Sequence, residues 1–264
     1  MKKTIIIGFL VSVLSILFFS FKNQETGKLE KWTSLFNGVN LNGWIVKING
    51  YPVNENIHNT FRVEDSILKV SYNDYENFGK AYGHIFYKTP FSNYRLKLQY
   101  RFVGNQAPGG QPWAYKNSGI MIHSQSPESM GIDQEFPVSL EVQLLGGIKH
   151  GIERHTGNLC TPGTHVEKDG KLITEHCINS TSKTYYDAAW ITTEITVYND
   201  SLIIHSIDGK EVLRYSKPVY GGEYLPDTNY WKAKQGQPVT GGYISLQSES
   251  HPVEFRKIEL LELK

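Results

Sequence analysis

A strict alternation of apolar and polar residues over positions 94–102 is the feature that most restricts how this chain can fold. Every even position holds Tyr, Leu or Phe, and every odd position holds Arg, Lys or Gln. Successive side chains of a strand point to opposite faces, so this pattern gives one apolar and one polar face. The segment therefore predicts an antiparallel strand with one face packed against a core.

Other segments repeat this pattern around short turns. The segment 61–72 reads as a hairpin that turns at 64–66. Strand 190–198 pairs with 202–207 through Asn199-Asp200, and 202–207 pairs with 211–215 through Asp208-Gly209, a two-residue hairpin signal. Residues 242–247 and 253–263 close the domain. The apolar parity of the last strand switches near Arg256-Lys257, which predicts a β-bulge there.

The fold class follows from the number of short strands and the absence of any useful helical period. We expect an all-β chain, folded as an antiparallel two-sheet jelly-roll sandwich. Sandwiches of this length form single domains, and no linker divides the 264 residues. Three long interruptions, at 104–116, 146–182 and 217–240, are candidates for site-building loops.

The first residues predict export. Met1-Lys2-Lys3 precedes a mostly apolar run over 5–21, as in a secretory signal peptide, so residues 1–22 are assigned as a signal or N-terminal anchor. No cysteine lies near this point, which excludes a lipoprotein. We expect a periplasmic or extracellular protein that contacts a membrane only through this segment, if it is not cleaved.

Charge and composition narrow the partners. The formal net charge is +1 with 20% charged residues, so the chain has no electrostatic footprint for nucleic acid. Aromatic residues make up 12%, with 16 Tyr and 5 Trp. Flat aromatic faces are surfaces on which sugars pack, although strand packing accounts for many of these rings.

The two cysteines, Cys160 and Cys177, form an even pair in an exported chain, which favours a disulfide. A disulfide that closes the intervening loop should stabilise the fold by roughly 3 kcal/mol, because it lowers the entropy of the unfolded chain. Zinc binding by Cys160 with histidines of the same loop is the alternative.

Short motifs in a fixed order then resemble one family. They read LFNG at 35–38, LNGW at 41–44, NSGI at 117–120, LEVQLL at 140–145, GYISLQ at 242–247 and PVEFRKI at 252–258. Together they resemble the 3-keto-disaccharide hydrolase family over residues 32–264. The resemblance implies a concanavalin A-like lectin/glucanase jelly roll that acts on glycosides whose sugar carries a ketone at C3.

Strand parity selects the candidate site residues. In each central strand the apolar residues should face the core, which turns the polar residues the other way. This places His123, Glu141, Gln143 and Gln247 on the non-core face, where they could converge. Glu141 is also the residue that the central family motif matches. Asn117, Arg154 and His155 are further candidate substrate contacts, the last two from the loop around Cys160.

The chemistry predicted for these residues is glycoside cleavage. A ketone at C3 acidifies the C2 proton, so a base, Glu141 or His123, could remove it and expel the aglycone from C1, with water adding afterwards. The C3 oxygen needs a hydrogen-bond donor or a cation, which leaves room for a divalent metal ion. A non-catalytic carbohydrate-binding module is the first alternative. An ordinary glucanase is disfavoured, because the 141–145 segment lacks a second acid.

Overall fold

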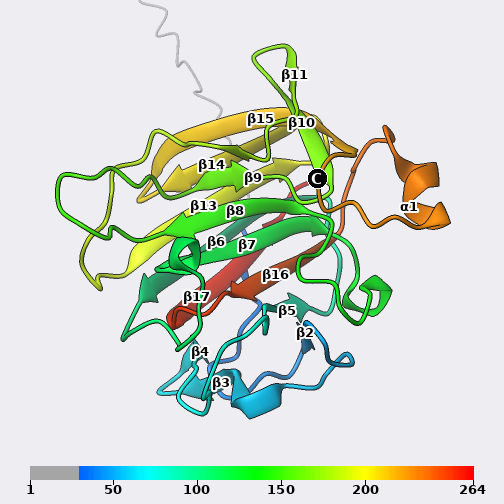
Figure 1. The fold of residues 1–264 in the computed structure, drawn as a ribbon. Coiled ribbons are helices and arrows are strands. Elements are labelled where there is room, and N and C mark those ends of the chain that lie inside the picture. Colours follow the sequence, from blue (N-terminus) through cyan, green and yellow to red (C-terminus); the bar gives the residue numbers. More distant parts are fainter. Residues whose placement is uncertain (1–29) are drawn as a thin grey trace, which may run out of the picture. The chain divides into compact units, whose positions relative to one another are not determined.

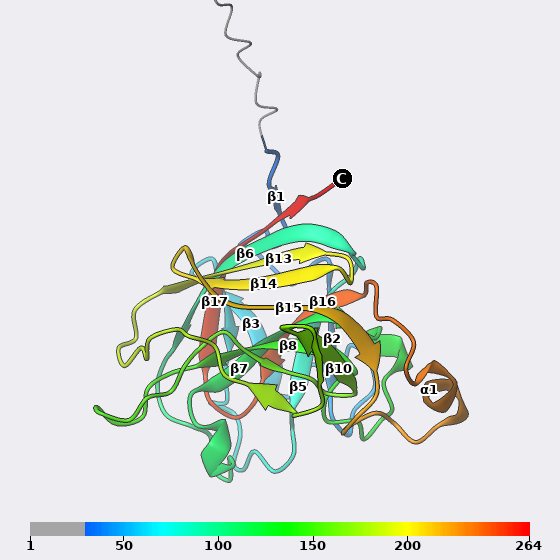
Figure 2. The same cartoon turned by 90° about the horizontal axis from the view of Figure 1, so that it is seen from above.

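Two antiparallel β-sheets packed face to face make up the body of the molecule (Figures 1 and 2). The computed structural model describes residues 30–264, so the predicted signal segment lies outside the described residues. Residues 31–264 form one compact unit. The predicted all-β two-sheet fold is confirmed.

One sheet has ten strands, in the order β11-β10-β15-β14-β13-β6-β17-β4-β3, with β1 paired to β17. Its strands are β1 (Thr33–Ser34), β3 (Phe61–Glu64), β4 (Ile67–Val70), β6 (Asn93–Phe102), β10 (Thr164–Lys168), β11 (Lys171–Ile173), β13 (Ile191–Tyr198), β14 (Leu202–Ile207), β15 (Lys210–Tyr220) and β17 (Val253–Glu262).

The other sheet has seven strands, in the order β12-β9-β8-β7-β16-β5-β2. Its strands are β2 (Trp44–Ile48), β5 (Gly83–Tyr87), β7 (Asn117–Ser124), β8 (Leu140–Leu145), β9 (Asn158–Cys160), β12 (Cys177–Ile178) and β16 (Tyr243–Ser248). Helical structure in the described chain is limited to α1 (Asn229–Lys234) and the 3-10 turns Ile57–Asn59, Pro112–Ala114 and Pro127–Ser129. None of these helices is long and apolar enough to cross a membrane.

The core lies between the sheets and uses the residues that alternation selects. All five even positions of β6 are buried, and they face apolar residues of the seven-stranded sheet such as Ile120, Leu140 and Val142. Burying one such side chain stabilises the fold by about 1.5–3 kcal/mol. The predicted hairpins at 61–72 and 190–215 form, and the register of β17 shifts between Arg256 and Glu259, as the bulge prediction required.

Candidate functional site

The outer face of the seven-stranded sheet carries an unusual set of buried polar side chains. Along one cross-strand row, Ser245 of β16 pairs with Met121 of β7, Met121 with Glu141 of β8, and Glu141 with Cys160 of β9. In the next row Leu246 pairs with Ile120, which places Gln247 opposite Gly119, and Gly119 pairs with Gln143. Strand parity therefore turns Glu141, Gln143 and Gln247 to one face.

A pocket of about 260 Å³ opens on this face, and we call it the carboxyl pocket. Its polar lining consists of Asn117, Glu135, Glu141, Gln143, His176 and Glu249. Trp113, Phe136, Pro162 and Tyr224 form the apolar part of its wall, together with both half-cystines. The pocket is slightly smaller than typical small-molecule sites of roughly 300–1,000 Å³.

Each of the three predicted site-building loops supplies part of this wall. Trp113 comes from the loop after β6, His176 and the two cysteines come from the long segment after β8, and Tyr224 follows β15. Trp113 stacks on Tyr82 with ring planes 12° apart, and about half of its surface remains exposed. Exposed aromatic rings beside buried acids are the surroundings expected of a sugar site.

Glu141 is held against the sheet because its neighbour on β7 is a glycine. A Cβ atom on Gly119 would lie 2.6 Å from Oε1 of Glu141, so any larger residue would displace the carboxyl group. The Glu141 side chain is almost fully buried. Burial raises the pKa of Glu141 to about 8.

A second carboxyl group lines the same pocket. Glu249 lies directly after β16, two residues beyond Gln247, and is 3% exposed. Its Oε2 atom has no hydrogen-bond partner in the protein. Burial raises the pKa of Glu249 well above its ordinary value, repulsion from Glu141 raises it further, and the positive charge of Arg154 opposes both effects. Two acids in such surroundings favour a state in which one is protonated and the other ionised.

Glu249 was not predicted from the sequence, and its presence corrects one argument made there. The 141–145 segment does lack a second acid, but the pocket does not, because Glu249 is supplied by a different strand. The missing acid therefore no longer counts against ordinary glycosidase chemistry. The available signal was the parity of β16, which continues outward from Ser245 and Gln247 to Glu249.

The predicted convergence of His123 with Glu141 is wrong. The pairing of β7 with β16 advances two residues on β16 but three on β7, so β7 contains a bulge, and His123 has φ 49°. The ring turns to the opposite sheet, where its Nε2 donates to the carbonyl oxygen of Asn199 at 2.9 Å. His123 is not among the residues that line the carboxyl pocket.

The remaining sequence candidates divide into two groups. Asn117 and Gln143 line the pocket, and Oδ1 of Asn117 has no protein partner. Gln247 lies on the same face but is fully buried, and both polar atoms of its amide lack a protein partner. Arg154 and His155, the other predicted substrate contacts, lie outside the pocket lining.

Arg154 instead holds the loop that carries Trp113. Its guanidinium group donates to the carbonyl oxygens of Tyr115, Lys116 and Gly146 at 2.6–3.0 Å. It also donates to the carbonyl oxygen of Trp113 at 3.2 Å. These bonds join that loop to the end of β8, while the positive charge of Arg154 offsets only part of the rise in the pKa of Glu249.

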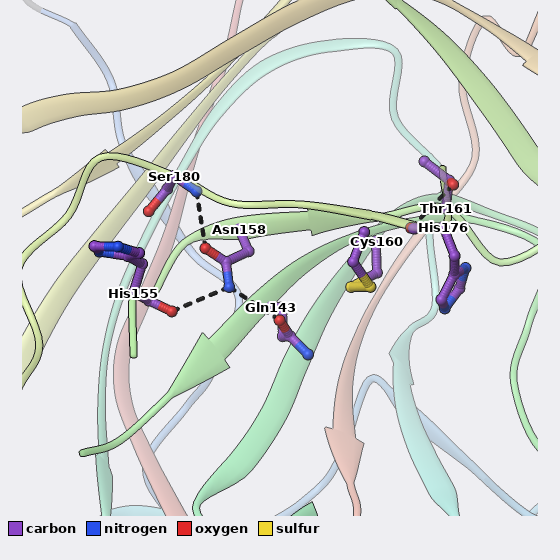
Figure 3. Close-up of a disulfide and its surroundings, with 8 residues drawn as sticks. Gln143, His155, Asn158, Cys160, Thr161, His176 and Ser180 are labelled. Atoms are coloured by element: carbon purple, nitrogen blue, oxygen red, sulfur yellow. Dashed lines mark hydrogen bonds between the residues drawn. A yellow bond between two sulfur atoms is a disulfide. The ribbon is translucent and has the colours of Figure 1, made fainter. Parts of the chain in front are cut away.

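The disulfide and Asn158 fix the other wall (Figure 3). Cys160 and Cys177 are bonded to each other across β9 and β12, as predicted. Asn158 lies between Gln143 and His155, donating to the Gln143 side chain and to the His155 carbonyl oxygen, and it accepts from the Ser180 backbone. The His155 ring donates from Nδ1 to the carbonyl oxygen of Ser182.

Metal binding by the cysteines is excluded by their pairing. Cys160, Cys177 and His176 come close enough to form a three-ligand group, but a disulfide offers no thiolate. The oxygen atoms of Glu141, Glu249 and Asn117 are of the type that binds hard divalent cations. Oε2 of Glu249 and Oδ1 of Asn117 are buried without a hydrogen-bond partner in the protein, which is compatible with that role.

Comparison with known proteins agrees with the motifs. The family model described as the 3-keto-alpha-glucoside-1,2-lyase-like domain matches residues 31–261. The chain belongs to this family, and the 3-keto-disaccharide hydrolase resemblance is confirmed. No curated protein sequence matches significantly.

Solved structures share the sandwich fold at low sequence identity. A provisionally assigned glycosyl hydrolase of Parabacteroides distasonis ATCC 8503 has a TM-score of 0.53 and 18% identity, over 88% of this chain and 100% of that one. An alginate lyase, AlyC3, in complex with dimannuronate has a TM-score of 0.50 and 13% identity, over 85% and 91%. The VIP36 exoplasmic/lumenal domain with Ca²⁺ and Man3GlcNAc has a TM-score of 0.50 and 10% identity, over 89% and 91%.

Proposed function

We propose that this protein is an exported enzyme that cleaves 3-keto-glycosides between C1 of the keto sugar and the glycosidic oxygen. The observation that carries the proposal is the pair of buried carboxyl groups, Glu141 and Glu249, in one pocket with aromatic walls. Family membership supplies the substrate class. The disulfide agrees with export, because such bonds persist in oxidising compartments.

The reaction needs one base and one acid. Glu141 acts in its ionised form, which a pKa of about 8 makes the minor form at neutral pH and also a stronger base. It takes the proton from C2, which the neighbouring C3 ketone has acidified, and the electron pair forms an enolate. The enolate then expels the glycosidic oxygen from C1, leaving a C1–C2 double bond. Protonated Glu249 gives its proton to the departing oxygen. The carboxyl pair ends with its proton on the other member, and both steps are general acid–base catalysis.

Hydrolysis follows if water adds across the new double bond. The water oxygen bonds to C1 as a hydroxyl group, and the proton that it loses goes to ionised Glu249. Glu141 returns its proton to C2, so both acids recover their starting states. The product is then the free 3-keto sugar. If the unsaturated sugar leaves before water adds, the same site acts as a lyase.

Substrate recognition falls to the amides and the aromatic walls. Asn117 and Gln143 present polar groups to the pocket, and a hydrogen-bond donor at the C3 oxygen stabilises the enolate. A divalent cation held by Glu141, Glu249 and Asn117 would supply the same stabilisation as a Lewis acid. Trp113, Phe136 and Tyr224 offer flat faces to the sugar ring.

The same carboxyl pair favours one other enzymatic function, ordinary glycoside hydrolysis, which also uses two acids. A purely lectin-like role would not require two buried acids of raised pKa, which are costly to keep in a fold. The proposed enzyme, an ordinary glycosidase and a lectin differ in which glycosides they cleave, if any.

Incubation with a glucoside and its 3-keto counterpart, with aglycone release followed in time, separates them. The proposal predicts release from the 3-keto-glucoside alone. Equal release from both compounds would identify an ordinary glycosidase. Binding of sugar without any release would identify a lectin.

A further inference from the structure

A second hollow lies beside the carboxyl pocket. It has a volume of about 770 Å³ and is open to solvent. Its large side chains are Ile132, Tyr224, Leu225, Pro226, Tyr230 and Trp231, and we call it the aromatic groove. Tyr224 belongs to both hollows, so they are adjacent at this ring.

The groove is rigidly built on both sides. The carbonyl oxygen of Ile132 accepts hydrogen bonds from the buried Lys47 Nζ at 3.0 Å and from the backbone N–H of Gly50 at 2.8 Å. On the other side, α1 buries Trp231 and presents Tyr230 edge-on to it, with ring centroids 5.0 Å apart. Tyr230 itself is 61% exposed. Apolar side chains are thus held in place at the surface, where a ligand can cover them.

The polar side chains of the groove are largely committed to the protein. The Gln134 amide bonds to Gln125 and to the carbonyl oxygen of Phe136. The Ser129 hydroxyl donates to the Ser126 carbonyl oxygen, and the Thr228 hydroxyl accepts from the Trp231 backbone. A sugar ring would find few protein partners for its hydroxyl groups here besides the exposed Asp133, whereas an aromatic ring gains from covering the apolar side chains.

We propose that the aromatic groove binds the leaving group of the glycoside and prefers a neutral aromatic aglycone to a second sugar. The proposal rests on the function assigned to the carboxyl pocket and adds to it the class of substrate. The keto sugar occupies the smaller carboxyl pocket beside Glu141, the glycosidic oxygen lies near Tyr224, and the aglycone ring covers Tyr230 and Ile132. The exposed carboxylate of Asp133, which also lines the groove, disfavours an anionic aglycone.

Binding measured without turnover tests the groove separately from the reaction. In the Glu141→Gln protein, calorimetry gives the Kd of three 3-keto-glucosides, whose leaving groups are methyl, 2-naphthyl and glucosyl. The naphthyl compound should bind most tightly. Adding Tyr230→Ala should weaken the naphthyl compound about fivefold, the scale of one aromatic contact, and leave the methyl compound unchanged. Tyr198→Ala, an exposed tyrosine of β13, is the matched control and should change nothing.

Several outcomes would overturn the inference. The glucosyl compound could bind more tightly than the naphthyl compound, or Tyr230→Ala could weaken the methyl and naphthyl compounds equally or leave both unchanged. Aglycone release by the wild-type protein is measured in parallel. If the wild-type protein releases no aglycone but Tyr230 still tightens binding of the naphthyl compound, the proposed reaction is refuted and the role of the groove is supported. If aglycone is released but Tyr230 does not tighten binding of the naphthyl compound, the reaction is supported and the role of the groove is refuted.

Discussion

The outer faces of the two sheets use charged residues in opposite ways. On the ten-stranded sheet, β6 alternates between buried and half-exposed residues, and its half-exposed arginines form ion pairs. Nη2 of Arg95 lies 2.8 Å from the Glu194 carboxylate, and Nε of Arg101 lies 2.6 Å from that of Glu254. On the seven-stranded sheet, Glu141 and Glu249 are buried, and neither forms an ion pair with a basic side chain within the described residues.

This difference separates acids that are paired with arginines from buried acids that have no such partner. A surface ion pair costs the fold little and stabilises it little. Two buried acids that repel each other cost stability, and groups with such shifted pKa values concentrate at functional sites. Glu194 and Glu141 are therefore a natural test pair, because both are strand glutamates on an outward face.

Glu141→Gln should have the largest effect. The change is nearly isosteric and removes the base, so turnover of a 3-keto-glucoside should fall by about 10² to 10⁴-fold with the fold intact. Steady-state rates measure it, and circular dichroism checks the fold. Glu194→Gln, on the other sheet, should keep wild-type turnover. Full activity in Glu141→Gln would remove the carboxyl pocket from the mechanism.

Loss of the disulfide should come next. The Cys160→Ser, Cys177→Ser double variant frees a loop with a sequence separation of 17 residues, so the free energy of unfolding should fall by roughly 3 kcal/mol. Denaturant unfolding measures the change. The wall that the disulfide gives the pocket would loosen too. An unchanged unfolding midpoint would show that β9 and β12 are held without it.

The pH dependence of stability should distinguish the two sheets. Because burial raises the pKa of Glu141 to about 8, the folded chain holds a proton that the unfolded chain loses near pH 4.5. The contribution of protonated Glu141 to stability is complete below the pKa that this group has in the unfolded chain, and it is lost as the pH rises towards 8. Glu141→Gln should therefore gain stability relative to wild type between pH 5 and pH 8.5, by up to about 4 kcal/mol.

Denaturant unfolding of both proteins at the two pH values measures this gain. Glu194→Gln should show no comparable dependence over that range. A Glu141→Gln difference that stays constant with pH would mean that the fold does not raise the pKa of Glu141.

The smallest effect belongs to the ion pair on the ten-stranded sheet. Glu194→Gln should cost at most about 1 kcal/mol of unfolding free energy, because the Arg95–Glu194 pair is partly solvated. The cost should shrink further in high salt. A loss of several kcal/mol, measured by denaturant unfolding, would erase the contrast between the two outer faces.

Much of the fold could be predicted because its signals are local. Alternation over 94–102 fixes the burial of β6, and two-residue turns fix the hairpins around Asn199-Asp200 and Asp208-Gly209. Parity also places Glu141 and Gln143 at one face, where the pocket lies. These predictions succeed because the side-chain period of a strand is two as long as no residue is inserted.

The failures occur where that period breaks or where contacts are long-range. A bulge in β7 turns His123 to the other sheet. The apolar residues of β7 show no switch in parity that would have predicted this bulge. The carbonyl partners of Arg154 lie 8 to 41 residues away in the chain, so its structural role could not be read locally. Glu249 was within reach, since the parity of β16 extends to it.

The most direct test of the account is the reaction in deuterated water with the released sugar examined at C2. Removal of the C2 proton by the carboxyl pair predicts either an unsaturated sugar with no hydrogen at C2 or a 3-keto sugar that carries deuterium there. A no-enzyme control measures slow exchange beside the ketone. Release of a 3-keto sugar without enzyme-dependent deuterium at C2 would contradict proton abstraction and identify direct displacement at C1.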